Sequence, residues 1–370
     1  MKASQKYALA LVVIVALIFS MGILMVFNTT SAEVLNRSLA VSTHHAFFKQ
    51  LGYAMLALLC AIGVYFFGYQ NTIKLSGFFL VVGTIALVAV FIPGIGQQIN
   101  GANRWVNLAG YSLQPSELMK LVIPIYFIKA LMHEKEKMGF KPFLRLIALL
   151  SVPIGLILIE PDNGTVAIIL ATLAVLFVLT RLKWLYWVVP MLFLAFCGTI
   201  AASQKSHVRT RINIYLNPEL DLRGKGHQPY QSKIAAGSGG ILGRGFGESM
   251  QKLDYLPEAR SDYIAAIFAE EFGFLGITGL IMLYMSLGGV GFYFALRARE
   301  IQGFYLVAIL TFLICFQAFL NLGVVSGLLP SKGTNLPFFS HGGSSLMANF
   351  IALGLIMSVR KDAKRAAIIR

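Results

Sequence analysis

Acidic residues are scarce in this chain, which has sixteen Asp and Glu among 370 residues. Charged residues of both signs make up 13% of it, whereas a soluble domain carries about 25%. Hydrophobic residues account for 57% of the chain, and its mean hydropathy is +0.73. This composition excludes an ordinary soluble domain and is typical of a protein that lies in a lipid bilayer.

Cysteine is also scarce, because the chain has only Cys60, Cys197 and Cys315, each inside an apolar run. Their odd number and their positions argue against a disulfide or zinc framework and favour small apolar side chains in the interior. The sequence has no nucleotide-binding phosphate loop, no zinc motif and no G-x-S-x-G nucleophile elbow. It therefore gives no support to the enzyme classes that depend on those motifs.

Basic residues are in excess, and the formal net charge is +15. Such a charge can indicate nucleic-acid binding, but here the Lys and Arg flank apolar runs and do not cluster in one motif. Basic residues of this kind are expected in the cytoplasmic connections of membrane proteins. The charge therefore favours a membrane protein over a nucleic-acid-binding protein.

Ten apolar runs approach or reach the length of about 20 residues that a membrane span needs. They lie at 7–28, 47–69, 75–94, 115–132, 143–159, 163–180, 184–203, 264–296, 303–326 and 343–359. The run at 264–296 exceeds one span, so its first part is expected at the interface or inside the protein. The predicted fold class is an all-α polytopic membrane protein with about ten transmembrane helices, in a single domain over residues 1–370.

The connections between these runs differ in charge. Fifteen Lys and Arg lie at the termini and in one alternate set of short connections, whereas the other set holds Arg37, Arg104 and Lys332. This bias predicts that both termini are cytoplasmic, which requires an even number of spans. It also predicts that the large polar connection at 204–263, before the eighth span, is extracytoplasmic.

The stretch LPEARSDYIAAIFAEE at 256–271 contains a quarter of all the acids. Pro257 can start a helix, and a helix from this point would put Glu258, Asp262 and Glu270 on one face. Asp262 lies where the polar connection becomes apolar, at a depth suited to a general base that acts on a lipid headgroup. The alternative interpretation is that these acids cap and solubilise a helix end.

Residues 101–120, GANRWVNLAGYSLQPSELMK, combine basic and acidic side chains at the mouth of the fourth run. Arg104 lies in an external connection, and Pro115 marks a helix start. Glu117 and Lys120 are spaced i, i+3 and can pair. Arg and Lys bind phosphate well, so the group could hold a diphosphate. The alternative is a paired interface whose long side chains reach toward the headgroups.

Two further stretches contain polar groups beside apolar runs. EPDNGT at 160–165 predicts a very short external turn in which Glu160 and Asp162 either hold a divalent cation or form an ordinary turn. GLLPSKGTNLPFFSHGGSSLMANF at 327–350 is irregular backbone that must be buried or line a cavity. Lys332 is its one charge, and His341 is interpreted as structural. On these residues alone, an enzyme for a lipid-linked substrate, a transporter and a membrane scaffold all remain open.

Six stretches in this order resemble the SEDS family (shape, elongation, division and sporulation) of bacterial membrane proteins. They are GANRWVNL, QPSELMK, EPDNGT, NPELDLRGKGHQPYQSKIAAGSGGILGRGFG, LPEARSDYIAAIFAEEFGFLG and NLGVVSGLLPSKGTNLPFFSHGGSSL. The resemblance covers nearly the whole chain and agrees with ten spans. The LLPSKG segment at 328–333 is similar to the cell-division branch of the family, and the elongation branch is the alternative.

The resemblance implies a peptidoglycan glycosyltransferase that polymerises lipid II on the outer face of the cytoplasmic (inner) membrane. It also implies a class B penicillin-binding protein as transpeptidase partner, together with other membrane proteins of the division complex. The family's essential Asp corresponds to Asp262, although Ser261 and Tyr263 replace the usual Thr and Phe. His341 replaces a Tyr of the family pattern. A lipid II flippase and a non-catalytic division scaffold are the alternatives.

Within this chemistry, Asp262 is expected to act as the general base of an inverting transfer. The leaving undecaprenyl diphosphate needs positive charge, from basic side chains or from Mg²⁺ or Mn²⁺. The basic candidates are Arg104, Lys120, Arg211, Lys233 and Lys332, with Glu117 orienting Lys120. The candidate supporting acids are Glu258, Asp162 and Glu270. A metal would lie near Asp262 or Asp162, and no organic cofactor is expected.

Overall fold

The computed structural model describes residues 2–37, 45–99, 102–108, 111–133, 138–192, 215, 218–221, 224, 226–253, 260–331 and 333–369. The helices of the first half are α1 (Lys2–Arg37), α2 (His45–Phe67), α3 (Tyr69–Ala89), α4 (Pro115–His133), α5 (Phe140–Ile159) and α6 (Asn163–Leu179). Those of the second half are α9 (His227–Ser238), α10 (Ile264–Leu296), α11 (Ile301–Val325) and α12 (Gly343–Ile369). The strands are β1 (Gly96–Ile99), β2 (Ala102–Leu108) and β3 (Tyr111–Leu113).

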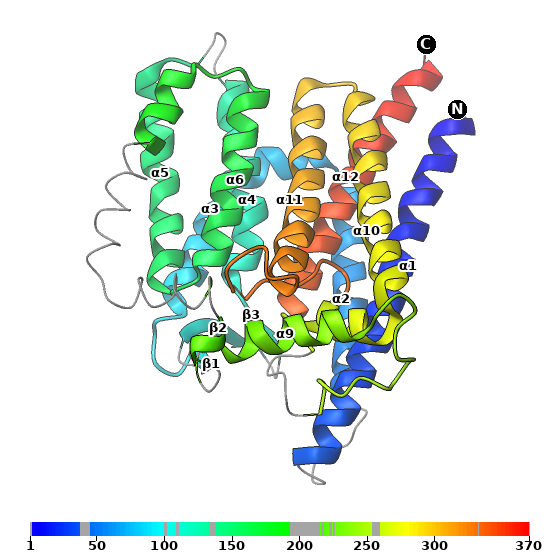
Figure 1. The fold of residues 1–370 in the computed structure, drawn as a ribbon. Helices are drawn as coiled ribbons and strands as arrows, with labels where there is room; N and C mark the ends of the chain where they lie inside the picture. Colours follow the sequence, from blue (N-terminus) through cyan, green and yellow to red (C-terminus); the bar gives the residue numbers. More distant parts are fainter. Residues whose placement is uncertain are drawn as a thin grey trace.

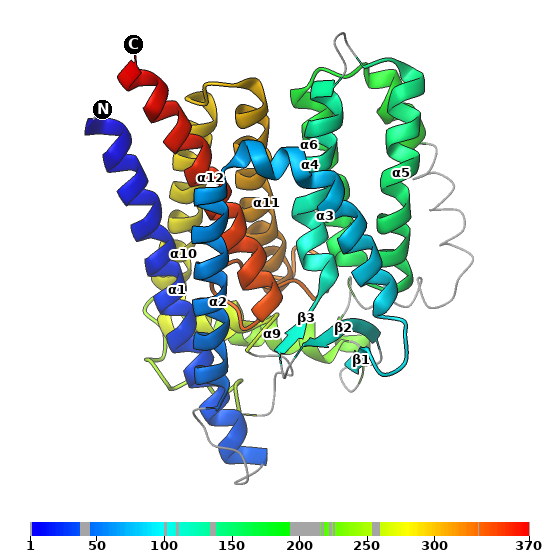
Figure 2. The ribbon, with the colours of Figure 1, turned by 180° about the vertical axis from the view of Figure 1, so that it is seen from behind.

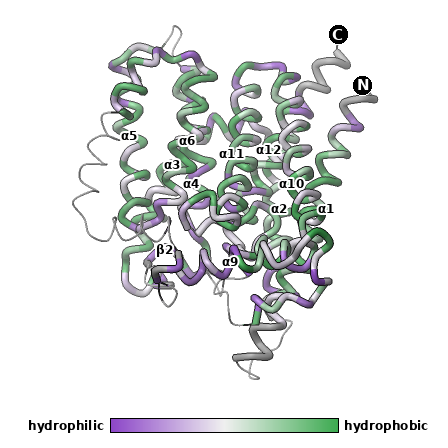
Figure 3. The backbone as a smooth tube through the Cα atoms, viewed as in Figure 1, coloured by the Kyte–Doolittle hydropathy of each residue, from purple (hydrophilic) through white to green (hydrophobic). Residues whose placement is uncertain are grey.

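The long helices run side by side along the bundle, and both chain termini lie at the same end of it (Figure 1). Helix α9 and the three strands lie at the opposite end, as the reverse view also shows (Figure 2). Hydrophobic residues follow the long helices, and hydrophilic ones gather near α9 and at the turns (Figure 3). Helix α9, the main described element of the connection at 204–263, therefore lies at the end of the bundle opposite the termini.

Among the described residues, seven helices are long and apolar enough to cross a membrane, and α6 is a shorter helix of the same character. Nine of the ten apolar runs coincide with helices. The remaining run, 184–203, lies mostly outside the described residues. The all-α polytopic fold is therefore confirmed, and the count of ten spans stays a prediction.

Helix α10 is interrupted at Gly273, whose φ of 66° and ψ of −163° are not helical. Glycine tolerates this conformation because it has no Cβ. The residues before the break, 264–271, are all buried inside the protein. The prediction that the first part of this long run lies at the interface or inside the protein is confirmed.

A small antiparallel sheet, in the order β1-β2-β3, lies beside the start of α4. Val106 of β2 pairs with Leu113 of β3, which is followed by Gln114 and then by α4. The backbone N–H of Ser112 donates to the Tyr53 hydroxyl at 3.1 Å, which ties β3 to α2. The strands are only three to seven residues long, so the sequence pattern predicted a polar connection here and not a sheet.

The buried centre of the bundle is formed by α10, α11 and α12, of whose apolar windows 56, 61 and 67% are buried, against 28% for α2, α3 and α5. Aromatic rings bind the segment before α12 to its neighbours. Phe339 packs edge-on against Phe268 of α10, and Phe338 against Phe350 of α12. This segment is the one that contacts Asp262.

Candidate functional site

Asp262 lies in the turn 260–263, directly before α10. Helix α10 begins only after this turn, so Asp262 does not lie within the helix that contains Glu270. The expectation that Asp262 and Glu270 share one face of a continuous helix is therefore wrong, and Glu258 lies outside the described residues. The physical reason is that the backbone before α10 is bound by another segment of the chain and does not continue the helical hydrogen-bond pattern.

That other segment is the irregular backbone before α12. The Ser340 hydroxyl donates to the carbonyl of Ser261 at 2.7 Å, and the backbone N–H of His341 donates to the carbonyl of Arg260 at 3.0 Å. His341 thus contributes its main chain to this contact. The non-helical backbones at 260–261 and 340–341 therefore hydrogen-bond to each other, because backbone polar groups buried at this depth need partners within the protein.

Asn321 of α11 and Gly333 also contact Asp262. The Asn321 Nδ2 donates to the Asp262 carbonyl at 2.8 Å and to the Thr334 carbonyl at 2.6 Å. A Cβ placed on Gly333 would lie 2.7 Å from Oδ2 of Asp262. The carboxylate therefore lies directly against the Gly333 backbone, in a space that only glycine leaves free.

Gln317 lies one helical turn before Asn321 and also donates from its amide to a backbone carbonyl of the segment after Gly333. Its Nε2 donates to the Asn335 carbonyl at 2.8 Å, and its Oε1 accepts from the Lys120 ammonium at 2.8 Å. Lys120 also pairs with Glu117 at 2.6 Å and is fully buried. The pairing predicted from the i, i+3 spacing is confirmed, and α4 is thereby connected to the segment beside Asp262.

Asp162 caps the start of α6, in the very short turn that the sequence predicted. Its Oδ1 accepts from the backbone N–H of Thr165 at 3.2 Å. Its Oδ2 accepts from Gln114 Nε2 at 3.0 Å and from the Ser116 hydroxyl at 3.1 Å. Both carboxylate oxygens are therefore engaged in joining the starts of α4 and α6.

The turn that contains Asp162 lies close to the segment that contacts Asp262, because Gly164 and Gly333 approach each other. A Cβ on Gly164 would lie 3.5 Å from the Gly333 carbonyl and 3.7 Å from Oδ1 of Asp162. The stretches at 160–165, 260–263 and 333–335 therefore meet at one place, although they are far apart in sequence.

Glu160 is fully buried, and within the described residues neither oxygen of its carboxylate has a hydrogen-bond partner. Arg104 binds the backbone beside it, donating from Nε to the Glu160 carbonyl at 2.8 Å and from Nη2 to the Pro161 carbonyl at 2.7 Å. Burial, reinforced by the Asp162 charge and opposed by Arg104, raises the pKa of Glu160 to about 8. The group is therefore mostly protonated near neutral pH.

Of the remaining predicted cations, Lys233 is exposed on α9. Its stem crosses Gly327, where a Cβ would lie 2.0 Å from the lysine Cε, so Lys233 lies over the connection that continues to Gly333. Arg211, Lys332 and Glu258 lie outside the described residues.

Glu270 and Glu271, each 1% exposed, bind the glycine-rich connection before the Asp262 turn. Glu270 accepts from the Ser249 hydroxyl at 2.6 Å, and Glu271 pairs with Lys252 at 3.0 Å. The acids of the 256–271 stretch therefore do not form one group: Asp262 faces Gly333, whereas Glu270 and Glu271 face another segment.

Asn321 and Gln317 are the site residues that the sequence analysis missed. They are polar side chains four residues apart inside the apolar run 303–326. Polar groups at membrane depth usually face the bundle interior and have a specific partner. That spacing was the available signal, because it puts both amides on one face of a helix.

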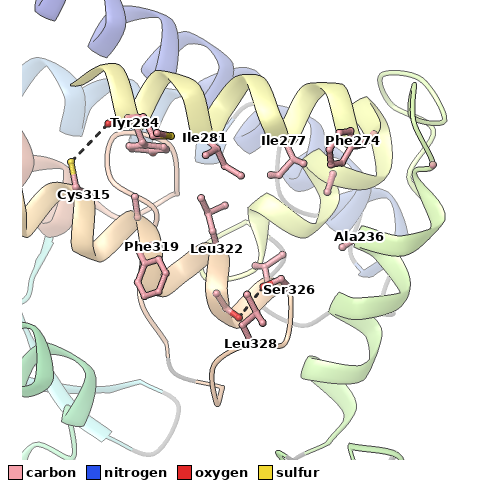
Figure 4. A pocket seen from close by; sticks show the side chains of 17 residues that line it. Ala236, Phe274, Ile277, Ile281, Tyr284, Cys315, Phe319, Leu322, Ser326 and Leu328 are labelled. Carbon is pink, nitrogen blue, oxygen red and sulfur yellow. Dashed lines mark hydrogen bonds between the residues drawn. The ribbon is translucent and has the colours of Figure 1, made fainter. Parts of the chain in front are cut away.

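An apolar groove of about 640 Å³ lies between α10, α11 and α9, with Tyr284 and Cys315 at one end and Ser326 and Leu328 at the other. Figure 4 shows side chains of α10 facing side chains of α11 across it. Its lining is almost entirely apolar and includes several small residues. The small lining residues are Ala236, Gly240, Ala269, Gly273, Ala318 and Gly323.

The sequence itself matches a known family over nearly its whole length. Residues 8–365 match the family described as the cell cycle proteins FtsW, RodA and SpoVE. The chain belongs to this family. The SEDS resemblance of the six ordered motifs is thereby confirmed, and a member of the FtsW/RodA/SpoVE family with these apolar helices is a multi-pass membrane protein.

Curated relatives of this family member carry the FtsW name. The probable peptidoglycan glycosyltransferase FtsW of Trichlorobacter lovleyi is 35% identical over 376 residues, which cover 98% of this chain and 95% of that protein. The protein of the same description from Geobacter metallireducens is 34% identical and covers 98% of this chain and 97% of its own length.

Solved structures agree with the fold. One, described as the structural coordination of polymerization and crosslinking by a peptidoglycan synthase complex, contains a chain that matches with a TM-score of 0.77 and 28% identity. The match covers 95% of this chain and 97% of that one. The crystal structure of Thermus thermophilus rod shape determining protein RodA matches with a TM-score of 0.68, 28% identity and coverage of 95% and 96%.

Proposed function

We propose that this FtsW/RodA/SpoVE family member is a peptidoglycan glycosyltransferase that polymerises lipid II into glycan strands for the septal wall. The curated FtsW relatives and the peptidoglycan synthase structure support this function. The observation that carries it in this chain is the contact of the Asp262 carboxylate with Gly333, where α10, α11 and the segment before α12 meet.

Asp262 is the general base of an inverting transfer in this proposal. The acceptor's GlcNAc 4-hydroxyl gives its proton to the Asp262 carboxylate as its oxygen attacks the anomeric carbon of the donor sugar. The bond between that carbon and the diphosphate oxygen breaks, a β-1,4 bond forms, and undecaprenyl diphosphate leaves with the bonding electrons. Holding the carboxylate in one position raises the reaction rate, because proton transfer requires the carboxylate to lie within hydrogen-bond distance of the attacking hydroxyl.

Basic residues at the same end of the bundle stabilise the charge on the leaving diphosphate. Lys233 is suited to this role because it is exposed and lies over Gly327, in the connection that leads to Gly333. Arg104 has two of its N–H groups bound to backbone carbonyls and is partly exposed. Lys120 is buried in its pair with Glu117, so its contribution is to hold the segment beside Asp262.

A divalent cation does not fit a centre built from the described side chains. Among them, no three His, Cys, Asp or Glu residues are grouped as metal ligands. Asp162 already accepts three hydrogen bonds. Magnesium is commonly bound by one or two carboxylates together with substrate phosphates, so Mg²⁺ or Mn²⁺ would be held mainly by the diphosphate of the bound substrate.

A second apolar groove suits the polyprenyl chain of the substrate. It measures about 350 Å³ and lies between α2, α3, α4 and α12. Leu113 and Pro115, at the junction of β3 and α4, line it. The groove therefore begins beside the helix that carries Glu117 and Lys120, so a lipid held there would have its headgroup near the Asp262 segment.

The partner in this proposal is a class B penicillin-binding protein with a single membrane span. The groove between α10 and α11 suits such a helix, since small residues at membrane-helix interfaces allow close approach. Replacing Ile281 in this groove with Trp is expected to reduce co-purification with the host's class B transpeptidase, whereas Ile85→Trp on exposed α3 is not. Equal recovery of the partner by both variants contradicts this location.

The proposed orientation puts both termini in the cytoplasm of an inner membrane and Asp262 at the outer face. The charge bias of the connections supports it, and so does the position of the termini and α9 at opposite ends of the bundle. Labelling of single cysteines introduced at Lys233 and at Lys361 with an impermeant maleimide, in intact spheroplasts, tests it. Labelling at residue 233 alone is the expected result.

The function is tested by co-reconstituting the protein with its cognate class B penicillin-binding protein, lipid II and Mg²⁺ or Mn²⁺, with transpeptidation blocked. Wild type is expected to make glycan chains on a gel, and Asp262→Asn is expected to make none while remaining folded. Equal polymer from both would refute the role of Asp262. Absence of polymer from wild type with the correct partner contradicts the enzyme and favours a lipid II flippase or a division scaffold.

A further inference from the structure

Residues 239–252, here called the splint, form backbone hydrogen bonds with α10 at its break. A break inside a buried helix leaves backbone groups unpaired, which is costly at membrane depth. The splint supplies partners on both sides of Gly273. The bonds run from Phe274 N to Gly240 O at 2.9 Å, Leu275 N to Ile241 O at 3.2 Å, Arg244 N to Glu270 O at 3.0 Å and Gly245 N to Glu271 O at 3.0 Å.

The splint approaches α10 so closely that it needs glycine. A Cβ on Gly239 would lie 2.1 Å from the Ala269 carbonyl oxygen, and one on Gly243 would lie 2.1 Å from the Glu271 carbonyl oxygen. Gly243 also has a positive φ of 82°. Contact with the broken helix therefore explains why residues 239 and 243 of this connection are glycine.

A buried triangle of polar side chains connects the splint to its neighbours. It is formed by Glu271, Lys252 and Asn28. The Asn28 Nδ2 donates to the two Glu271 oxygens at 2.8 and 2.7 Å, and Lys252 pairs with Glu271 at 3.0 Å. The Lys252 ammonium also donates to Asn28 Oδ1 at 2.7 Å. The side chains of Lys252 and Glu271 are 7% and 0% exposed. The triangle joins α1, the splint and α10.

Residues 264–271 form a short buried helical segment with the triangle at one end and Asp262 next to the other. Beside Asp262, the Tyr263 hydroxyl hydrogen-bonds the Ser331 hydroxyl at 2.8 Å. A packed helical segment moves as a unit, so a shift or rotation at Glu271 reaches the turn at 260–263.

We propose that the Glu271–Lys252–Asn28 triangle positions Asp262 against Gly333 by fixing the first segment of α10. This role rests on the proposed function for the chemistry of Asp262. A buried ion pair contributes little net stability compared with apolar packing, because desolvation offsets the attraction. The triangle is therefore expected to act on geometry, and Glu271, Lys252 and Asn28 are positioning residues that do not touch the substrate.

The kinetic test compares Glu271→Gln and Lys252→Met with wild type in the reconstituted polymerisation assay. Both variants are expected to lower kcat on the order of 10- to 100-fold, since small displacements of a catalytic group have effects of that size. The KM for lipid II is expected to stay within about twofold, because ground-state binding is not changed. Lys252→Gln replaces Lys252→Met if the latter does not fold.

Glu300→Gln is the matched control. Glu300 is also a hydrogen-bonded carboxylate, accepting from Tyr69 at 3.2 Å, from Gln70 at 2.9 Å and from Gln302. It belongs to the turn between α10 and α11, at the end of α10 away from the splint. This variant is expected to keep the wild-type kcat.

Rescue comes from the double variant Glu271→Lys with Lys252→Glu. The Asn28 amide can turn over and offer its oxygen to residue 271 and its nitrogen to residue 252, so the exchanged charges can pair again. The double variant is expected to recover most of the activity lost in Glu271→Lys alone. Failure to recover any, in a double variant that folds, counts against a role that depends on the pair.

A spectroscopic test is independent of activity. With 3-fluorotyrosine at Tyr263, the ¹⁹F signal reports the hydrogen bond to Ser331, and Ser331→Ala gives the signal of the broken bond. Glu271→Gln and Lys252→Met are expected to move the signal toward that of Ser331→Ala, whereas Glu300→Gln leaves it unchanged. Wild-type signals and wild-type kcat in folded triangle variants overturn the proposal. A wild type that makes no polymer refutes the proposed function, and the ¹⁹F result still decides the positioning of the turn.

Discussion

Gly333 and Asp262 are in direct contact, since a Cβ on residue 333 would lie 2.7 Å from the Asp262 carboxylate oxygen Oδ2. The contact joins two segments that are about seventy residues apart in the chain. Asn321 fixes both of them by donating to the Asp262 and Thr334 carbonyls. The position of the Asp262 carboxylate therefore depends on the backbone of the segment at 333–334 as well as on its own turn.

Replacing Gly333 with Ala is expected to displace the Asp262 carboxylate and to lower kcat by about tenfold or more, because misplaced catalytic groups lose rate steeply. Gly155→Ala is the control, since a Cβ at Gly155 meets nothing within 4 Å. The measurement is the polymerisation rate per folded enzyme. A Gly333→Ala enzyme as active as Gly155→Ala would falsify the assignment of this contact to catalysis.

Asn321→Leu is expected to reduce activity and stability together. The change leaves the Asp262 and Thr334 carbonyls without this donor, and a buried unsatisfied group costs about 1–3 kcal/mol. Asn71→Leu on α3 is the control, because the Asn71 bond to the Phe67 carbonyl is exposed. Thermal unfolding in detergent and polymerisation rates are the readouts, and matching values for the two variants would contradict the bridging role.

Lys120→Met is expected to destabilise the protein by about 3–5 kcal/mol, because it leaves the Glu117 charge without its buried partner. The double variant with Glu117→Gln removes that charge and is expected to recover much of the loss. Chemical denaturation followed by intrinsic fluorescence measures both. If the double variant is less stable than Lys120→Met, the buried-charge explanation is incorrect.

Glu160→Gln is expected to stabilise the protein in a pH-dependent way. The folded pKa of Glu160 is raised from 4.5 to about 8, so the unfolded state ionises first and wild-type stability falls as pH rises through this interval. The variant is expected to have a higher Tm than wild type at about pH 8 and a similar Tm near pH 4.5. A Tm difference that is the same at both pH values would show that the buried carboxyl does not titrate in this interval.

Local patterns predicted the features that depend on neighbouring residues. The apolar runs predicted the long helices, Pro115 the start of α4, the EPD turn the start of α6, and the i, i+3 spacing the Lys120–Glu117 pair. The prediction of a helix through Asp262 was wrong, because it took into account only the neighbouring residues in the sequence. The backbone contacts from residues 340 and 341 that hold the turn come from the far end of the chain.

The sequence by itself determined that this protein crosses a membrane several times, that it carries the SEDS motifs and that Asp262 lies where polar chain becomes apolar. Composition and order along the chain are sufficient for those conclusions. Only the tertiary structure decided that Asp262 lies against Gly333, that Asn321 bridges their segments, and that Glu271 binds Lys252 and Asn28. These contacts join residues far apart in sequence, and they form because buried polar groups must find partners among whatever segments the packing of the helices brings together.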